Sequence, residues 1–415
     1  MSTDAPDERL TVLRHPDLRR YLSARFIVSL GTQVQTVAVG WQVFLVSGDP
    51  FDLGLVALSQ FLPFIVLILP AGHVADRYDR RRVQLITYIL LAMCSVALLA
   101  LALGGVTETG PVFAVMVLFG VARAFNQPTG QALLPNLAPI ALFPRAVAVN
   151  SSLGEVAMIA GPALGGVLVL FGVQVAYALS VVLLVLGVVL VAGLRGGGRD
   201  ATSSEPISWS TLLSGVSFVR SRPIVLGSTS LDLFAVLFGG ATALLPLYAG
   251  EILDVGPVGL GVMRAAPAVG AGLLAAVVAV RPLRRHVGRW MFGGVIAFGI
   301  STIVFGVSTS LPLSLAALVV MGAGDMVSVY IRHLLVQLET PDAIRGRVSA
   351  VNSVFIGASN ELGEFESGVT AAWWGIVPAV VVGGAATLAV AGAWMRLFPV
   401  LRRLDRFPEA EPDRR

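Results

Sequence analysis

Hydrophobic residues occur in long blocks along this chain, and polar residues or turn formers separate the blocks at regular intervals. A helix that crosses a membrane needs about 20 mostly apolar residues, and twelve blocks are long enough. They predict helices over residues 22–46, 53–75, 83–104, 111–134, 146–170, 174–194, 223–249, 257–280, 290–308, 312–335, 347–371 and 376–398. The pattern therefore predicts an all-α polytopic membrane protein with twelve transmembrane helices.

One long polar segment divides the predicted helices into six and six. It contains three consecutive glycines and several charges, a composition that cannot bury itself in a core. We expect a cytoplasmic N-terminal segment (1–20), a six-helix bundle (21–194), a cytoplasmic connecting loop (195–222), a second six-helix bundle (223–398) and a cytoplasmic tail (399–415).

The two halves also match in their polar residues. Arg145 and Asn150 recur as Arg347 and Asn352, each 202 residues later. A repeat of this kind predicts two pseudo-symmetric bundles related by an axis along the membrane normal, with a binding site between them.

Composition supports the membrane assignment and indicates an orientation. Only 13% of the residues are charged, against about 25% in a soluble domain. All 29 basic residues are arginine; four are assigned to predicted helices (Arg25, Arg123, Arg264 and Arg332), and the other 25 to one side or to the helix ends on that side. The positive-inside rule makes that side cytoplasmic and places both termini there. Because the positive charge is a topology signal, we expect no nucleic-acid partner.

Carboxylates within the predicted helices are the candidate proton-coupling residues, since each costs several kcal/mol unless it is paired or hydrated. The candidates are Glu155, Asp232, Asp325, Glu361 and Glu364, whereas Glu366 points away from the face of Glu361 and Glu364. Glu361 and Glu364 share a helix face, so they repel one another and favour the binding of a proton. Asp232 and Asp325 have no obvious basic neighbour at their depth. Structural ion pairing is the alternative for each carboxylate, with Arg123 beside Glu155 and Arg264 beside Glu361.

Polar side chains at helical spacing predict faces that turn inward, because lipid would leave them unsatisfied. With the buried cations and one aromatic residue they form the candidate substrate cavity: Arg25, Ser29, Gln33, Thr36, Arg123, Asn126, Gln127, Phe234 and Arg264. Core packing is the alternative for Phe234. The histidines and the single cysteine show no ligand spacing, and there is no phosphate-binding loop or nucleophile–base pair. We therefore expect no metal, no cofactor and no enzyme activity.

Two short motifs carry a family resemblance. One motif lies at the cytoplasmic end of the second predicted helix and contains Gly72, Asp76, Arg77, Arg80 and Arg81. The other lies in the fifth predicted helix and contains Gly161, Pro162, Gly165 and Gly166. They resemble the loop signature and the antiporter motif of the major facilitator superfamily, with Asp79 in place of a usual glycine. In that family the first motif is a gate latch and the second bends a helix. A simple positive-inside anchor and ordinary tight packing are the alternatives.

The residues 29–43 and 131–135 are similar to the drug:proton antiporter branch, which includes enterobactin and macrolide exporters. The resemblance implies a monomeric transporter in the bacterial cytoplasmic (inner) membrane. Its partners are a small drug-like or siderophore-like organic substrate, protons and membrane lipid. Export from the cytoplasm by proton antiport with alternating access is the leading hypothesis. A proton-coupled importer or facilitator of a small metabolite, or a lipid-handling membrane protein, are the alternatives.

Overall fold

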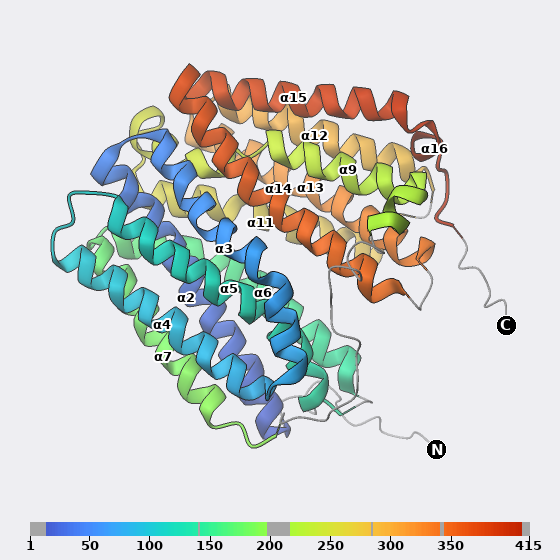
Figure 1. Ribbon diagram of the computed structural model, residues 1–415. Helices are drawn as coiled ribbons and strands as arrows, with labels where there is room; N and C mark the ends of the chain where they lie inside the picture. Colours follow the sequence, from blue (N-terminus) through green and yellow to red (C-terminus); the bar gives the residue numbers. More distant parts are fainter. Residues whose placement is uncertain (1–13, 140–141, 197–215, 284, 341–343, 409–415) are drawn as a thin grey trace, which may run out of the picture. The chain divides into compact units, whose positions relative to one another are not determined.

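The structure is a computed structural model that describes residues 14–139, 142–196, 216–283, 285–340 and 344–408. Across these residues the chain forms twelve long helical stretches (Figure 1). The first six are α2 (Pro16–Ser47), α3 (Pro50–Arg77), α4 (Arg80–Leu103), α5 (Gly110–Leu137), α6 (Phe143–Val169) and α7 (Val173–Ala192). The later ones are α9 (Pro223–Phe238) with its continuation, α11 (Gly256–Val280), α12 (Val287–Val307), α13 (Leu311–Glu339), α14 (Arg345–Trp374) and α15 (Ile376–Leu397), and a short α16 (Pro399–Arg402) follows.

Ten of these stretches are long and apolar enough to cross a membrane. The other two are α2 and α14, which are 32 and 30 residues long and correspond to the first and eleventh predicted spans. Both carry more polar residues than their neighbours. The all-helical fold predicted from the apolar blocks is confirmed.

The seventh predicted span is interrupted, although the apolar pattern predicted one helix over 223–249. The α-helix α9 ends at Phe238 and is followed by Gly239 and Gly240. A 3₁₀ turn η2 (Ala241–Leu244), a short α10 (Leu245–Leu247) and a π-helical turn η3 (Tyr248–Ile252) complete the stretch. Two successive glycines weaken a helix because their backbone loses the most conformational freedom on folding, and Gly240 lies directly against the Gly363 carbonyl of α14.

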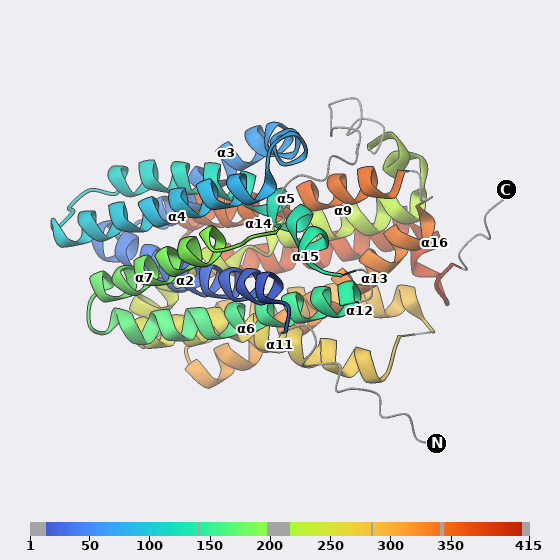
Figure 2. The ribbon, with the colours of Figure 1, turned by 90° about the horizontal axis from the view of Figure 1, so that it is seen from below.

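The chain forms two compact units, one made of residues 1–42 and 62–206, the other of 43–61 and 207–415. In the first unit α4 packs against both α5 and α7 (Figure 2). In the second, α12 packs between α13 and α15, α13 contacts α11, and α14 contacts α9. The six-and-six division of the chain into bundles stays a prediction.

Corresponding turns in the two units have the same backbone geometry. Gly172 joins α6 to α7 with φ of 106°, and Gly375 joins α14 to α15 with φ of 89°. Residues with side chains rarely adopt these angles. The two glycines lie 203 residues apart, close to the repeat found in the sequence.

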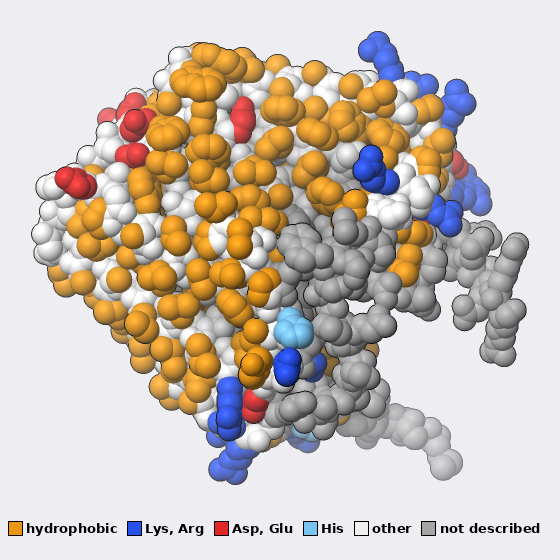
Figure 3. Space-filling model, in the orientation of Figure 1, with side chains coloured by type: hydrophobic (Ala, Val, Ile, Leu, Met, Phe, Trp, Pro, Cys, Tyr) orange, Lys and Arg blue, Asp and Glu red, His pale blue; other side chains and the backbone are white. Residues whose placement is uncertain are grey.

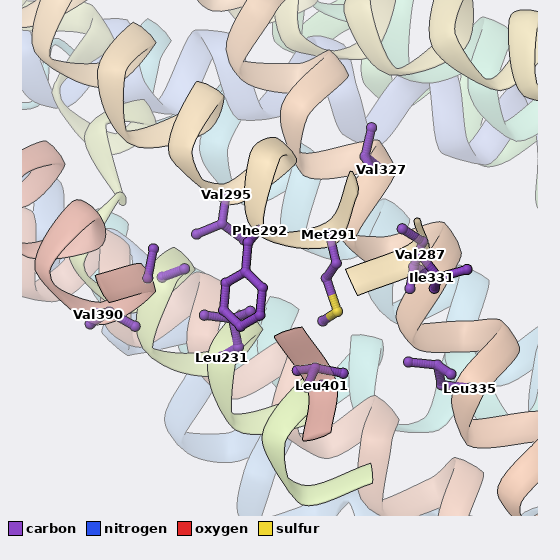
Figure 4. Close-up of a cluster of buried hydrophobic side chains, with 12 residues drawn as sticks. Leu231, Val287, Met291, Phe292, Val295, Val327, Ile331, Leu335, Val390 and Leu401 are labelled. Carbon is purple, nitrogen blue, oxygen red and sulfur yellow. The ribbon is translucent and has the colours of Figure 1, made fainter. Parts of the chain in front are cut away.

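The second unit is organised around a hydrophobic cluster (Figure 4). Leu231, Met291, Phe292, Ile331 and Leu335 are among its fully or nearly fully buried members, and they join α9, α12 and α13.

Most of the surface seen in Figure 3 is apolar as well, and arginine side chains gather at helix ends. An apolar surface between charged helix ends is what a lipid environment requires.

Candidate functional site

A buried ion pair joins α9 to α13 in the second unit. Arg332 Nη1 lies 2.7 Å from Asp232 Oδ2, and the two side chains are only 1% and 4% exposed. The expectation that Asp232 has no basic neighbour is therefore wrong. Such a pair is retained against a large desolvation cost, because each charge compensates the other.

The ion pair lines a small cavity of about 170 Å³ inside this unit. The polar part of its wall is formed by Asp232, Thr242, Asp325, Arg332, Ser359, Asn360 and Glu364. The apolar part includes Val236, Phe298, Met321, Val329 and Ile356. Three of the five predicted proton-coupling residues thus lie around one space, from α9, α13 and α14. An apolar wall with a few convergent polar groups is typical of a binding site.

The interruption after α9 shapes one side of this cavity. Gly239, Gly240 and Thr242 line it, and Thr242 Oγ1 donates a hydrogen bond to Glu364 Oε1 at 3.2 Å. Irregular backbone at membrane depth is tolerated where it is buried in protein or lines a cavity. The break in α9 therefore lies where irregular backbone can be tolerated.

Asp232, Asp325 and Arg332 form a charged group in the wall of the cavity. Among the described residues, the carboxylates of Asp232 and Asp325 and the guanidinium of Arg332 line the same space. Arg332 uses Nη1 for Asp232, while its Nε and Nη2 atoms find no hydrogen-bond partner among the described residues. Asp325 precedes Arg332 by seven residues, two turns of α13, so both lie on one face of that helix. The guanidinium of Arg332 therefore lies in one cavity wall with two carboxylates, those of Asp232 and Asp325.

The remaining predicted residues of the second unit have other surroundings. Glu361 on α14 and Arg264 on α11 are half-buried, and their pairing stays a prediction. The Phe234 ring lies 5.3 Å from the ring of Trp394 and packs against the hydrophobic cluster. Phe234 therefore packs in the core, which is the alternative given for it in the sequence analysis.

In the first unit, the predicted polar faces form hydrogen bonds between helices. Arg25 Nη1 donates to the Tyr21 hydroxyl at 3.2 Å, and that hydroxyl donates to the Gly130 carbonyl at 2.6 Å. Asn126 Oδ1 accepts a bond from Gln84 Nε2 at 2.6 Å. These contacts join α2 and α4 to α5, as expected of polar groups turned away from lipid.

Other predicted residues of this unit are less enclosed. Gln127 and Glu155 are exposed, Ser29 is half-buried, and Thr36 Oγ1 donates to the Thr32 carbonyl one turn earlier. The guanidinium carbon of Arg123 lies 5.8 Å from the centre of the Phe64 ring. The pairing of Arg123 with Glu155 stays a prediction.

Sequence reasoning missed a second polar face of α2. Gln35 accepts a hydrogen bond from Ser95 of α4, and Gln42 accepts one from Tyr177 of α7 at 2.6 Å. Both glutamines are buried. Their spacing of seven residues, two helical turns, is the signal that could have placed them on one face.

The arginines of the predicted gate motif hold helix ends together within the first unit. Arg80 Nη1 donates to the Ala132 carbonyl and to Asn136 Oδ1, both at 3.2 Å on α5. Arg81 Nη2 donates to the Ala192 carbonyl at 2.6 Å, at the end of α7. Ala192 is the last residue of α7, so Arg81 satisfies a carbonyl that the helix end leaves without a partner.

Asp79, which replaces the usual glycine of this motif, has a role of its own. It caps α4, because its Oδ1 accepts hydrogen bonds from the backbone N–H groups of Arg81 and Arg82 at 2.9 and 3.2 Å. Of the other motif residues, Gly72 is buried and Arg77 is exposed. The side chain of Asp76 lies outside the described part of the chain.

The glycines of the fifth-helix motif bring α6 and α2 into close contact. A Cβ at Gly161 would lie 2.5 Å from Gln33 Cβ, and one at Gly165 would lie 3.1 Å from the Val34 carbonyl oxygen. Pro162 and Gly166 are buried beside them. The close contact does not extend to Gly154 on the same helix, where a Cβ would meet no heavy atom of the described residues within 4 Å.

Comparison with known proteins gives consistent matches over nearly the whole chain. Residues 8–411 match the family described as transmembrane secretion effectors. The chain is 27% identical to the multidrug efflux pump Tap of Mycobacterium tuberculosis, over 95% of this chain and 96% of that protein. It is 25% identical to the enterobactin exporter EntS of Citrobacter koseri, over 96% of this chain and 95% of that protein.

Among solved structures, the chain is similar to a bacterial homologue of the human lysosomal transporter Spinster in an inward-facing, unoccupied conformation. The TM-score is 0.73 at 14% identity, and the match covers 98% of this chain and 100% of that one. At this identity the likeness concerns the fold alone.

Proposed function

This chain belongs to the transmembrane secretion effector family of the major facilitator superfamily, and we propose that it exports a small organic molecule from the cytoplasm by proton antiport. The family and fold expected from the sequence are confirmed, and the chain is an integral membrane transporter rather than an enzyme. The named relatives are a multidrug efflux pump and an enterobactin exporter. They favour a drug-like or siderophore-like substrate.

The observation that carries the proposal is the unequal charge around the cavity of the second unit. Asp232 and Asp325 share Arg332, so this group of three has a net charge of −1 when both carboxylates are ionised. A buried net charge is costly, and one proton removes it. The site is therefore suited to alternate between a protonated and a deprotonated state, which antiport requires.

Arg332 provides the proposed link between proton and substrate. When Asp232 takes up a proton, its hold on Arg332 weakens, and the guanidinium turns toward Asp325 on its own helix. This movement changes the charge that the cavity presents to a substrate. Release of the proton restores the Asp232–Arg332 contact of 2.7 Å. The ligand that binds one arrangement better than the other shifts the equilibrium between them.

The remaining parts of the proposal follow from the sequence and the family. We place both termini in the cytoplasm, because the arginine-rich connections lie on their side. The protein works as a monomer in the bacterial cytoplasmic membrane, and its bundles alternate access to the substrate. Glu155, Glu361 and the polar residues of the first unit are further candidate contacts.

Inverted membrane vesicles that contain the protein test this function. With an acidic lumen, we expect uptake of ethidium or of enterobactin, representing the two relatives, and loss of that uptake when nigericin collapses the pH gradient. Vesicles without the protein provide the background. Accumulation that is indifferent to the pH gradient would contradict proton antiport, and substrate entry into intact cells against a gradient would contradict export.

A further inference from the structure

A second and larger cavity lies at one end of the second unit, away from the buried ion pair. Its volume is about 680 Å³, and it is bounded by the first turns of α12, the end of α15 and the segment that follows α16. We call it the tail cavity. Phe292, a buried member of the hydrophobic cluster (Figure 4), is one of the residues that line it.

The chain after α16 is fastened over the beginning of α12. The backbone N–H of Gly288 donates to the Leu404 carbonyl at 2.9 Å, and that of Val287 donates to the Asp405 carbonyl at 3.3 Å. His286 Nδ1 lies 2.8 Å from Asp405 Oδ1. The first N–H groups of α12 are therefore already satisfied, and side chains supply the charge of the cavity.

That charge is positive. Arg289, Arg402 and Arg403 line the cavity, and Asp405, the one acidic residue among the described lining residues, is engaged by His286. Three guanidiniums against one carboxylate give a net charge of +2 with His286 neutral. All three arginines are exposed, so an anion can reach them. Guanidinium groups recognise phosphate oxygens in bidentate geometry.

The wall away from the arginines is apolar. Phe292, Ile296 and Met395 line it, and Ile296 follows Arg289 by seven residues, about 10 Å along α12. Gly293 lies between them, and a Cβ at this position would meet no heavy atom within 4 Å. The cavity thus continues from charged helix ends into the apolar, membrane-facing part of the same helices.

We propose that the tail cavity binds an anionic phospholipid, with its phosphate on the three arginines and its acyl chains over Gly293 and Ile296. Basic pockets at helix ends are suited to anionic headgroups at the membrane surface. A free phosphate ion would use the arginines alone and leave the apolar wall empty, so the combined lining favours a lipid. The site is independent of the proton-coupling cavity.

Purified, delipidated protein in detergent provides the test, with lipid binding followed by native mass spectrometry. We expect phosphatidylglycerol and cardiolipin to bind more tightly than phosphatidylcholine. Arg402→Ala and Arg403→Ala should each weaken phosphatidylglycerol binding roughly fivefold. Arg285→Ala removes the same charge from a neighbouring exposed arginine outside the cavity lining, and it should change binding less than twofold.

Gly293→Leu separates a lipid from a free anion. It should weaken the binding of phosphatidylglycerol without changing that of inorganic phosphate, because the new side chain occupies the space of an acyl chain. Equal binding of phosphatidylcholine would overturn the proposal, and so would phosphate binding as tight as that of the lipid. Unchanged lipid binding in all three cavity variants would overturn it as well. Thermal unfolding of each variant without lipid confirms that it is folded.

Discussion

Arg332 is a fully buried cation whose contact with Asp232 lies deep in a membrane protein. Removing Arg332 leaves buried carboxylates uncompensated, and the loss of a buried partner costs about 3–5 kcal/mol in proteins where it has been measured. We expect Arg332→Gln to lower the midpoint of thermal unfolding in detergent, and Asp232→Asn to lower it less, because Asp325 remains to compensate the guanidinium. The double variant should lose less than the sum of the two, because the contact between the two residues is lost only once. Additive losses would show that the residues do not depend on one another.

The sequence could identify Asp232 but not its partner. A carboxylate within an apolar block is conspicuous because of its desolvation cost, whatever the fold. The apolar pattern predicts a span that ends at residue 335. Arg332 lies only three residues before that end, near the expected edge of the membrane. The helix α13 continues to Glu339, so Arg332 lies two turns from its end and about as deep as Asp232. Whether side chains of two helices can form an ion pair depends on differences in position of one helical turn. The hydrophobic pattern of the sequence does not define helix ends that closely.

At the scale of elements, the contact between α6 and α2 depends on the absence of a side chain. Gly161→Val should disturb this packing, since even a Cβ would lie 2.5 Å from Gln33 Cβ. We expect a lower unfolding temperature and less monodisperse protein by size-exclusion chromatography. Gly154→Val is the matched control on the same helix, where a Cβ meets nothing within 4 Å. Equal effects of the two variants would contradict the assigned contact.

The start of α4 depends on a cap rather than on apolar packing. Asp79→Ala should destabilise this helix end by about 1 kcal/mol, because two backbone N–H groups lose their acceptor. Hydrogen–deuterium exchange of residues 81–83 should become faster. Asp79→Asn keeps an acceptor oxygen and should exchange like the native protein. Unchanged protection in Asp79→Ala would mean that the cap contributes nothing.

The elements were predictable to very different degrees. Uniform apolar blocks such as 174–194 become single helices, because length and hydrophobicity decide the matter in a membrane. The interruption after α9 was missed, since Gly239 and Gly240 lie inside an apolar block and small residues are common in transmembrane helices. The reason for the break is the close approach of Gly363 on α14, a contact between residues more than a hundred positions apart.

For the whole molecule, the arginine distribution predicts an orientation that labelling can test. Cys94 is the chain's one cysteine and is 2% exposed, so Cys94→Ala gives a clean background. In intact cells, a membrane-impermeant maleimide should label Glu108→Cys. It should label Arg82→Cys, whose native side chain is 84% exposed, only after the cells are permeabilised. The reverse pattern would contradict the proposed topology.

The internal repeat can be recognised from the sequence alone, because arginine, asparagine and proline matches are rare by chance in apolar sequence. The turns at Gly172 and Gly375 extend it to backbone geometry. The proposed proton-coupling site does not follow this symmetry. The cavity with Asp232, Asp325 and Arg332 belongs to the second unit, and the glycine contact of α6 with α2 belongs to the first.

The central claim is that Asp232, Asp325 and Arg332 couple substrate movement to protons. Reconstituted into proteoliposomes, Asp325→Asn should still exchange radiolabelled substrate across the membrane at equal pH, and it should no longer accumulate substrate when a pH gradient is imposed. Glu108→Gln, at an exposed position on a loop, should retain both activities. Gradient-driven accumulation by Asp325→Asn at the native level would contradict the account.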